Sequence, residues 1–282
     1  MTDRSRSGFT WVELVVSLVI IVVGLALLVT YLNHNGLHSA RQVTCLNKQH
    51  QLSIALLNYE SHHGHFPGYV GRVGEESVED HLAASWVVHL FPYLDRYDLW
   101  QTWKAGDPRT VYLKLMVCSS DPLNRATSGS PLLSYVANCG LPGDADTPAC
   151  GVFHNHDVDG EPVRVSIDYI LKHDGAATTL LLSENIQAGR WTDTAEADVG
   201  MVWHRTPGPG NRINEGIDAG DRPQQIKYAR PSSHHGGGAN VSFCDGHQYF
   251  LREDIDYEVY QHLMTPDSDG AGLSRVLEEG DF

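Results

Sequence analysis

A long uncharged hydrophobic segment lies close to the N-terminus of the chain. The residues from Leu14 to Leu32, LVVSLVIIVVGLALLVTYL, follow a short polar stretch, Met1 to Gly8, that contains Arg4 and Arg6. A helix rises about 1.5 Å per residue, so this segment is long enough to cross a hydrocarbon core of about 30 Å. Positive residues beside a span favour the cytoplasmic side. The pattern predicts a single-pass cytoplasmic (inner) membrane protein whose C-terminal head is extracytoplasmic or periplasmic.

Helical spacing continues beyond the apolar segment. No proline occurs through Tyr59. Four residues recur on one helical face, namely Cys45, Leu52, Leu56 and Tyr59. Gly64 and Pro67 follow, and glycine with a nearby proline is a common helix stop. We therefore expect one transmembrane and stem helix over residues 9–63.

The residues after this helix predict mixed secondary structure. The aromatic stretch from Ala84 to Trp103 predicts a helical region that is bent or restarts at Pro92. Three runs rich in β-formers predict strands, namely Leu113 to Cys118, Leu132 to Cys139 and Thr178 to Glu184. We expect the aromatic side chains to belong to the core.

The C-terminal region predicts a hairpin, a helix and a tail. Val241 and Phe243 alternate before Asp245-Gly246, a pair favoured in tight hairpin turns. A short helix is expected over residues 254–263, and the Gly- and acid-rich residues 265–282 are expected to be disordered. The patterns together predict an α+β fold, in which a long N-terminal helix packs on a head, residues 64–264, with an antiparallel β-sheet.

Charge and cysteine content narrow the class of protein. The formal net charge of −15 provides no broad cationic surface, so no nucleic-acid partner is expected. The five cysteines lie far apart without a CxxC pair, which does not match the usual spacing of a structural zinc site. In a chain exported to an oxidising compartment, disulfide bonds are the better expectation.

An acidic residue at the start of the apolar segment points to a special role, because an ionisable group in a membrane is costly without a partner. This residue is Glu13, and the surrounding GFTWVELVVSLVIIVVG resembles the prepilin-type cleavage and methylation signal of type IV pilins and type II secretion pseudopilins. The resemblance implies that a prepilin peptidase cuts after Gly8, that the leader is residues 1–8, and that Phe9 is methylated. It also implies that Glu13 pairs with the N-terminal amine of a neighbouring subunit. Trp11 departs from the smaller aliphatic residue common at its position.

The body resembles a large bacterial family of pilin-like proteins with a domain of unknown function. The C-terminal hallmark of that family is a histidine, nine residues and Asp-Gly, which corresponds here to His235, Asp245 and Gly246. Further matching stretches are LNKQHQLSIALLNYESHHGHFPG, SWVVHLFPYLD, MVCSSDP, LSYVANCG and LLLSENIQAGRW. The resemblance covers nearly the whole chain and implies no biochemical activity.

Polar clusters raise three alternatives. One cluster contains His234, His235, Asp245 and His247. It would bind a transition metal if the fold brought its members together, but a hairpin turn is the simpler interpretation. Residues 154–162, HNHDVDGEP, offer oxygen ligands to calcium, but they lack EF-hand spacing and a solvated turn is the simpler interpretation. Cys244 with His235 or His247 and Asp245 would be a hydrolytic nucleophile, but no family-specific motif supports it and a buried strand cysteine is expected. We expect no catalytic residue, no metal site, no cofactor and no enzyme activity.

Four cysteines are the disulfide candidates, namely Cys45, Cys118, Cys139 and Cys150. A bond between Cys45 and Cys118 would tie the stem to the head, and one between Cys139 and Cys150 would close a small loop. Other pairings stay open, because connectivity does not follow from sequence. Each bond would stabilise the exported domain by about 2–4 kcal/mol.

These observations predict a pseudopilin-like structural or assembly subunit, tied to secretion or envelope assembly. Its expected partners are the prepilin peptidase, membrane lipid and other pseudopilin subunits, in homo- or hetero-oligomers. The alternative is a monomeric anchored extracytoplasmic receptor or metal-binding module that uses the pilin signal only for sorting.

Overall fold

The computed structural model describes residues 10–74, 81–121, 130–143, 147–217 and 225–273. Gly8 and Phe9, at the predicted cleavage site, lie outside these residues. The chain divides into two compact units, residues 1–41 and residues 42–282.

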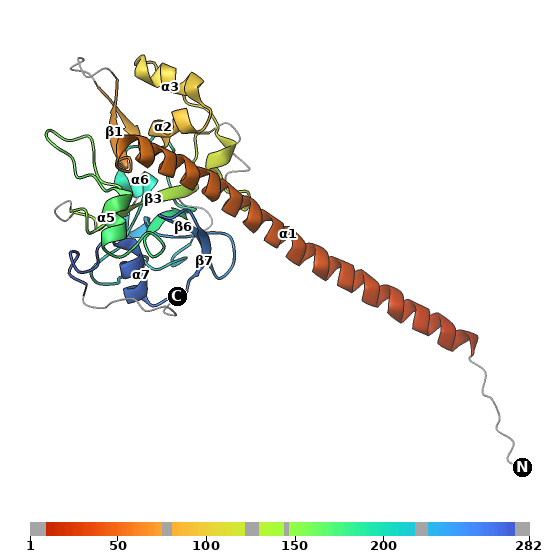
Figure 1. The fold of residues 1–282 in the computed structure, drawn as a ribbon. Helices are drawn as coiled ribbons and strands as arrows, with labels where there is room; N and C mark the ends of the chain where they lie inside the picture. Colours follow the sequence, from red (N-terminus) through yellow and green to blue (C-terminus); the bar gives the residue numbers. More distant parts are fainter. Residues whose placement is uncertain (1–9, 75–80, 122–129, 144–146, 218–224, 274–282) are drawn as a thin grey trace, which may run out of the picture. The chain divides into compact units, whose positions relative to one another are not determined.

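Helix α1 spans Trp11–His63 without interruption (Figure 1). It ends where the sequence predicts, because Gly64 adopts a φ of 75° and its N–H donates to the carbonyl of Glu60 at 2.7 Å. Glycine adopts this left-handed conformation without the steric cost of a Cβ. The prediction of one long helix that stops at Gly64 is confirmed.

In the first unit, α1 exposes apolar side chains around its whole circumference. The large ones from Trp11 to Val23, together with Leu25 and Leu28, are all at least 40% exposed. Unlike an amphipathic surface helix, this stretch has no separate polar face. Within the described part of the chain, no helix combines the length and the apolarity that a membrane span requires.

In the second unit, the rest of α1 buries one face. The buried face contains the residues predicted from the helical spacing, namely Cys45, Leu52, Leu56 and Tyr59. Gln49 shares this face. Its side-chain amide N–H donates to the carbonyl of Asn240 at 2.8 Å, and its amide oxygen accepts from the Ser242 hydroxyl at 3.2 Å. These bonds join α1 to strand β6 (Gly238–Phe243).

The head contains a five-stranded sheet with the strand order β5-β3-β4-β6-β7. Its other strands are β3 (Tyr135–Gly140), β4 (Leu180–Glu184), β5 (Gly200–Val202) and β7 (Gln248–Arg252). Neighbouring strands are antiparallel except β3 and β5, which are parallel. The sheet is therefore mixed and not purely antiparallel as expected. After β4 the chain crosses β3, and β5 pairs with the edge of β3 that faces away from β4.

The aromatic stretch folds into short helices. They are α2 (Trp86–His89), the 3-10 helix η1 (Phe91–Tyr93) and α3 (Tyr97–Lys104), so the predicted restart at Pro92 is confirmed. Strands β1 (Val70–Val73) and β2 (Leu82–Ser85), which precede α2 in the chain, form a separate antiparallel pair. Three indoles are fully buried and donate to backbone carbonyls, as expected of core residues; they are Trp86, Trp191 and Trp203.

One predicted strand is wrong. Residues Lys114–Met116 form a 3-10 helix, η2, where the sequence predicts a strand from Leu113 to Cys118. Leu113 and Met116 are both buried and lie three positions apart, which suits a helical turn. A short apolar run does not by itself distinguish the two structures. The other two predicted strands are confirmed as β3 and β4.

The C-terminal hairpin and helix are confirmed as β6–β7 and α7 (Tyr257–Met264). Within the described residues, the remaining elements are α5 (Ile167–Lys172), α6 (Glu196–Val199) and the 3-10 helix η3 (Ile226–Tyr228). The prediction that the tail is disordered is wrong for residues 265–273, because these residues pack on the head. Thr265 is fully buried, and the Ser268 hydroxyl donates to Asp174 at 2.6 Å. Residues 274–282 lie outside the described part.

Candidate functional site

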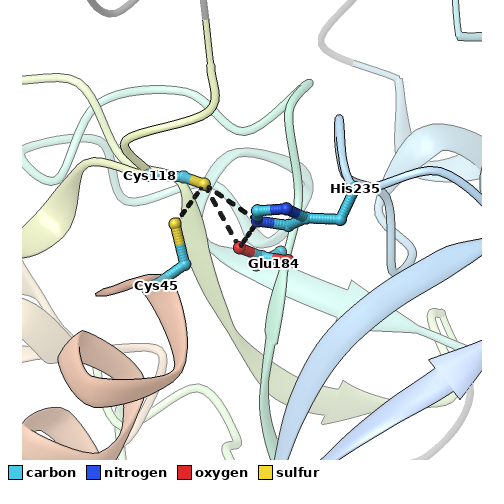
Figure 2. A group of neighbouring side chains, drawn as sticks. All are labelled: Cys45, Cys118, Glu184 and His235. Atoms are coloured by element: carbon cyan, nitrogen blue, oxygen red, sulfur yellow. Dashed lines mark hydrogen bonds and ion pairs between the residues drawn. The ribbon is translucent and has the colours of Figure 1, made fainter. Parts of the chain in front are cut away.

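Four side chains able to bind metal or exchange protons meet inside the head (Figure 2). Cys45 comes from α1, and Cys118 follows η2. Glu184 is the last residue of β4, and His235 lies in the loop before β6. All four are buried, and the most exposed, His235, is 5% exposed. Segments distant in the sequence thus direct polar atoms to one point, called the cluster below.

Cys118 lies in the middle of the cluster. Its sulfur is 2.7 Å from the sulfur of Cys45 and 3.2 Å from Oε1 of Glu184. It is also 3.6 Å from Nε2 of His235, which lies 3.2 Å from the same Glu184 oxygen. One ligand atom from each residue lies within 4.8 Å of all the others. These separations suit a single small ion or a shared proton network.

Strand pairing positions the carboxylate of Glu184. The neighbouring strand β6 provides the N–H of Asn240, which donates to Oε2 at 3.0 Å. The other oxygen, Oε1, faces Cys118 and His235. Because one oxygen is held by the backbone, the other has a defined direction into the cluster.

Loop residues position a sulfur and the imidazole. The N–H of Ser119 donates to the sulfur of Cys45 at 3.3 Å. The N–H of His235 donates to the hydroxyl of Ser233 at 3.0 Å. Gly237 then adopts a φ of 89°, and this conformation, which favours glycine, leads the chain into β6.

The cluster members shift one another's protonation. Burial alone would lower the pKa of His235, but hydrogen bonds to Cys45 and Glu184 outweigh burial and raise it to about 9. The Cys118 thiol, with His235 and Ser119, holds the pKa of Cys45 well below its usual range. The neighbouring Cys45 and burial raise the pKa of Cys118. The arrangement therefore favours a thiolate at Cys45 beside an imidazolium at His235.

The three signature residues do not form one site. His235 precedes β6 and belongs to the cluster, whereas Asp245 and Gly246 form the turn after β6. In that turn Gly246 has a φ of 90°, and Asp245 accepts from the N–H of His247 at 3.0 Å. A six-residue strand spans about 20 Å, so the ends are far apart. The alternative metal site built from the histidines around this motif is thus divided.

Glu13 has a partner at the start of α1. Its carboxylate accepts from the N–H and the hydroxyl of Thr10 at 2.9 and 2.7 Å, and its own N–H donates to that hydroxyl at 3.4 Å. This reciprocal pair is a capping box, which stabilises a helix N-terminus. The spacing of Thr10 and Glu13 in the sequence is that of a capping box, a signal that the resemblance to a processing motif had obscured. The assembly role of Glu13 stays a prediction.

All five cysteines are buried. Cys45 and Cys118 are adjacent, whereas the Cys139 sulfur lies against Gly200 and the Cys150 sulfur accepts from the Thr147 hydroxyl at 3.4 Å. Disulfide bonds at Cys45–Cys118 and Cys139–Cys150 stay predictions. Burial raises the pKa of Cys244, which makes this thiol a poor nucleophile.

The acidic loop considered for calcium is used for ion pairs. Arg72 donates to Asp157 at 2.7 Å and to Asp159 at 3.3 Å, and His81 lies 3.0 Å from Asp157. The same region borders a cavity of about 700 Å³ that is lined by His65, His89, His156 and Arg164 among others. The lining of this cavity includes no member of the cluster.

Sequence reasoning missed Glu184 as a site residue. The only sequence signal was an ionisable residue at the end of the apolar run TTLLLSE. A buried carboxylate is rare without a partner, and this rule could have marked it as a candidate. Its partners, however, come from segments that no spacing rule connects.

A family model described as a protein of unknown function (DUF1559) matches residues 38–258. The match covers more than half of the chain and includes all four cluster residues. No curated protein and no solved structure matches the chain. The chain therefore belongs to the DUF1559 family of proteins of unknown function.

Proposed function

We propose that this chain is a pseudopilin-like structural or assembly subunit, anchored in the inner membrane and processed by a prepilin peptidase after Gly8. One observation carries the proposal: the GFTWVE signal runs into the first residues of a helix whose N-terminal part exposes its apolar side chains all round. Such side chains require cover from lipid or from the helices of other subunits. A membrane and a bundle of like subunits would provide both.

The continuity of α1 supports the same proposal. The helix runs unbroken from its exposed apolar part to the face that Leu52 and Leu56 bury in the head. A single helix that serves as anchor and as part of a folded head is the architecture expected of a pilin-like subunit. Residues Trp11–His63 would form this stem.

A structural role also agrees with the closure of the cluster. None of its members is more than 5% exposed, so a substrate would have no access to the sulfur, imidazole or carboxylate atoms. Enzyme active sites are usually placed in clefts open to their ligands. We therefore propose a structural or binding role for the head and no catalytic one.

The proposal is tested by mass spectrometry, which determines the N-terminal residue and the intact mass of the membrane-extracted chain. The chain is produced with and without the host prepilin peptidase. We expect a methylated Phe9 start that depends on the peptidase. Gly8→Val should block cleavage, and Ser7→Ala, one residue earlier, is the matched control. An unprocessed Met1 start in the presence of the peptidase, or cleavage near Ala40, would contradict the proposal.

The cluster supports a second candidate function, namely an anchored metal-binding module that uses the pilin signal only for sorting. Such a module would be processed in the same way but would remain monomeric. Assembly, and not processing, therefore distinguishes the two functions.

A further inference from the structure

We propose that Cys45, Cys118, Glu184 and His235 together bind one thiophilic divalent metal ion such as zinc. The four side chains would form a closed structural site. The spacing of the cysteines in the sequence predicts no metal site, and the proposed function does not require one. The proposal concerns the head alone and stands independently of processing and assembly.

The donor set fits this class of ion. Zinc takes thiolate, imidazole and carboxylate ligands, and its structural sites are closed by four protein ligands. The cluster offers two sulfurs, one imidazole nitrogen and one carboxylate oxygen, all buried. Because each ligand comes from a different segment, the usual CxxC spacing is absent from the sequence.

Three of the six separations between ligand atoms fit tetrahedral coordination. Ligands at about 2.0–2.3 Å from zinc lie about 3.3–3.8 Å from one another. From Cys118, the carboxylate is at 3.2 Å and the imidazole at 3.6 Å, and the last two are 3.2 Å apart. The two sulfurs, at 2.7 Å, must separate by about 1 Å. A small rotation about χ1 of each cysteine provides this movement.

Outer hydrogen bonds already orient two of the ligands. Asn240 donates to the Glu184 oxygen that faces away from the cluster, and Ser119 donates to the sulfur of Cys45. Metal sites commonly hold their ligands by such second contacts. Both donors are backbone N–H groups, so folding alone places them.

The charge is also balanced. Coordination releases the protons of Cys118 and His235 to solvent. Two thiolates and one carboxylate then carry −3, the neutral His235 adds none, and a divalent ion leaves a net charge of −1. Lys48 interacts electrostatically with Cys45 and Cys118, and its Nζ donates to the carbonyl of Val117 at 2.6 Å. Its ammonium offsets the remaining charge in this buried region.

A disulfide between Cys45 and Cys118 is the competing chemistry, because it would use the same two sulfurs. It accounts for two of the four residues and leaves Glu184 and His235 as a buried ion pair. A metal ion accounts for the convergence of all four. The two states exclude each other, which makes the experiment decisive.

The experiment uses the full chain, extracted in detergent. Metal per chain is measured by elemental mass spectrometry, and the state of Cys45 and Cys118 by peptide mapping under non-reducing conditions. The native ion is then removed by chelation under reducing conditions and replaced by Co²⁺. We expect one ion per chain, with the charge-transfer and d–d absorption of thiolate-bound tetrahedral cobalt.

The variants Cys118→Ser and His235→Gln should lower metal content to near zero and remove or shift the cobalt bands. Cys244→Ala, a buried cysteine outside the cluster, and His247→Gln, in the exposed turn, are matched controls that should keep one ion per chain. Should a cluster variant fail to fold, the cobalt spectrum of the wild-type chain still decides. A native Cys45–Cys118 disulfide, or reduced wild-type chain without thiolate–cobalt bands, would overturn the proposal.

Discussion

At the scale of single residues, two partly buried histidine rings, His89 and His156, border the cavity of the head. Burial lowers the pKa of His89 to about 4, although a backbone hydrogen bond at Gly71 partly opposes this shift. Burial and the neighbouring His65 also lower the pKa of His156 to about 4. Both rings line the same cavity and are neutral at neutral pH. Protonation of either ring would therefore oppose folding.

This arrangement predicts acid sensitivity. An unfolded histidine has a pKa of about 6.5, so below that pH the unfolded chain binds more protons than the folded one. Stability should fall as the pH decreases from about 6.5 to 4, by about 2 kcal/mol for His89. Urea unfolding at several pH values would measure this change.

The variant His89→Gln should have a shallower loss of stability over that pH range than the wild type. His50→Gln, which removes an exposed histidine from α1, is the matched control. Identical pH slopes for His89→Gln and the wild type would contradict this interpretation.

At the scale of elements, α1 stabilises the head through one buried face. Leu52 and Leu56 are fully buried, whereas Ile54 on the same turn is 45% exposed. Gln49 adds hydrogen bonds to β6 on the buried side. The stem part of the helix is therefore part of the folded core.

Substitution on the two faces of α1 should have unequal effects. Leu52→Ala should destabilise the chain by about 2–5 kcal/mol, because it leaves a cavity in the core. Ile54→Ala, the matched control, should change stability by about 0.5 kcal/mol or less. The comparison is made by denaturant unfolding in detergent, and similar losses for both variants would contradict the assigned packing.

At the scale of the whole molecule, Glu13 has two possible roles. Within one chain it forms the capping box with Thr10. In an assembly its charge would pair with the N-terminal amine of a neighbouring subunit, an attraction that is strong in a low dielectric. The two roles require different chemistry, because glutamine also serves in a capping box but carries no charge.

We expect Glu13→Gln and Glu13→Ala both to reduce assembly at least about tenfold, which corresponds to 1.4 kcal/mol. Ser17→Ala, one turn along the same exposed helix, should assemble normally. Cross-linked oligomers are quantified at equal membrane abundance. Normal assembly of Glu13→Gln would reject the charge-pairing role, and a monomeric wild-type chain would favour the alternative of an anchored binding module.

The features that the sequence alone predicted correctly depend on neighbouring residues. The stop of α1 at Gly64, its buried face and the hairpin at Asp245-Gly246 each follow from local periodicity or from the conformational freedom of one glycine. The strand expected at Leu113 to Cys118 was wrong because a short apolar run is compatible with more than one local structure.

The site, in contrast, was decided by tertiary structure. Strand β6 separates His235 from Asp245, although the motif joins them in sequence. Pairing of β4 with β6 and packing of α1 bring Glu184 and Cys45 to His235. The sequence by itself therefore determined the stem helix and the terminal hairpin, because these are encoded by adjacent residues. Only the tertiary structure decided the parallel placement of β5 and the four-residue cluster, because both depend on contacts between segments far apart in the chain.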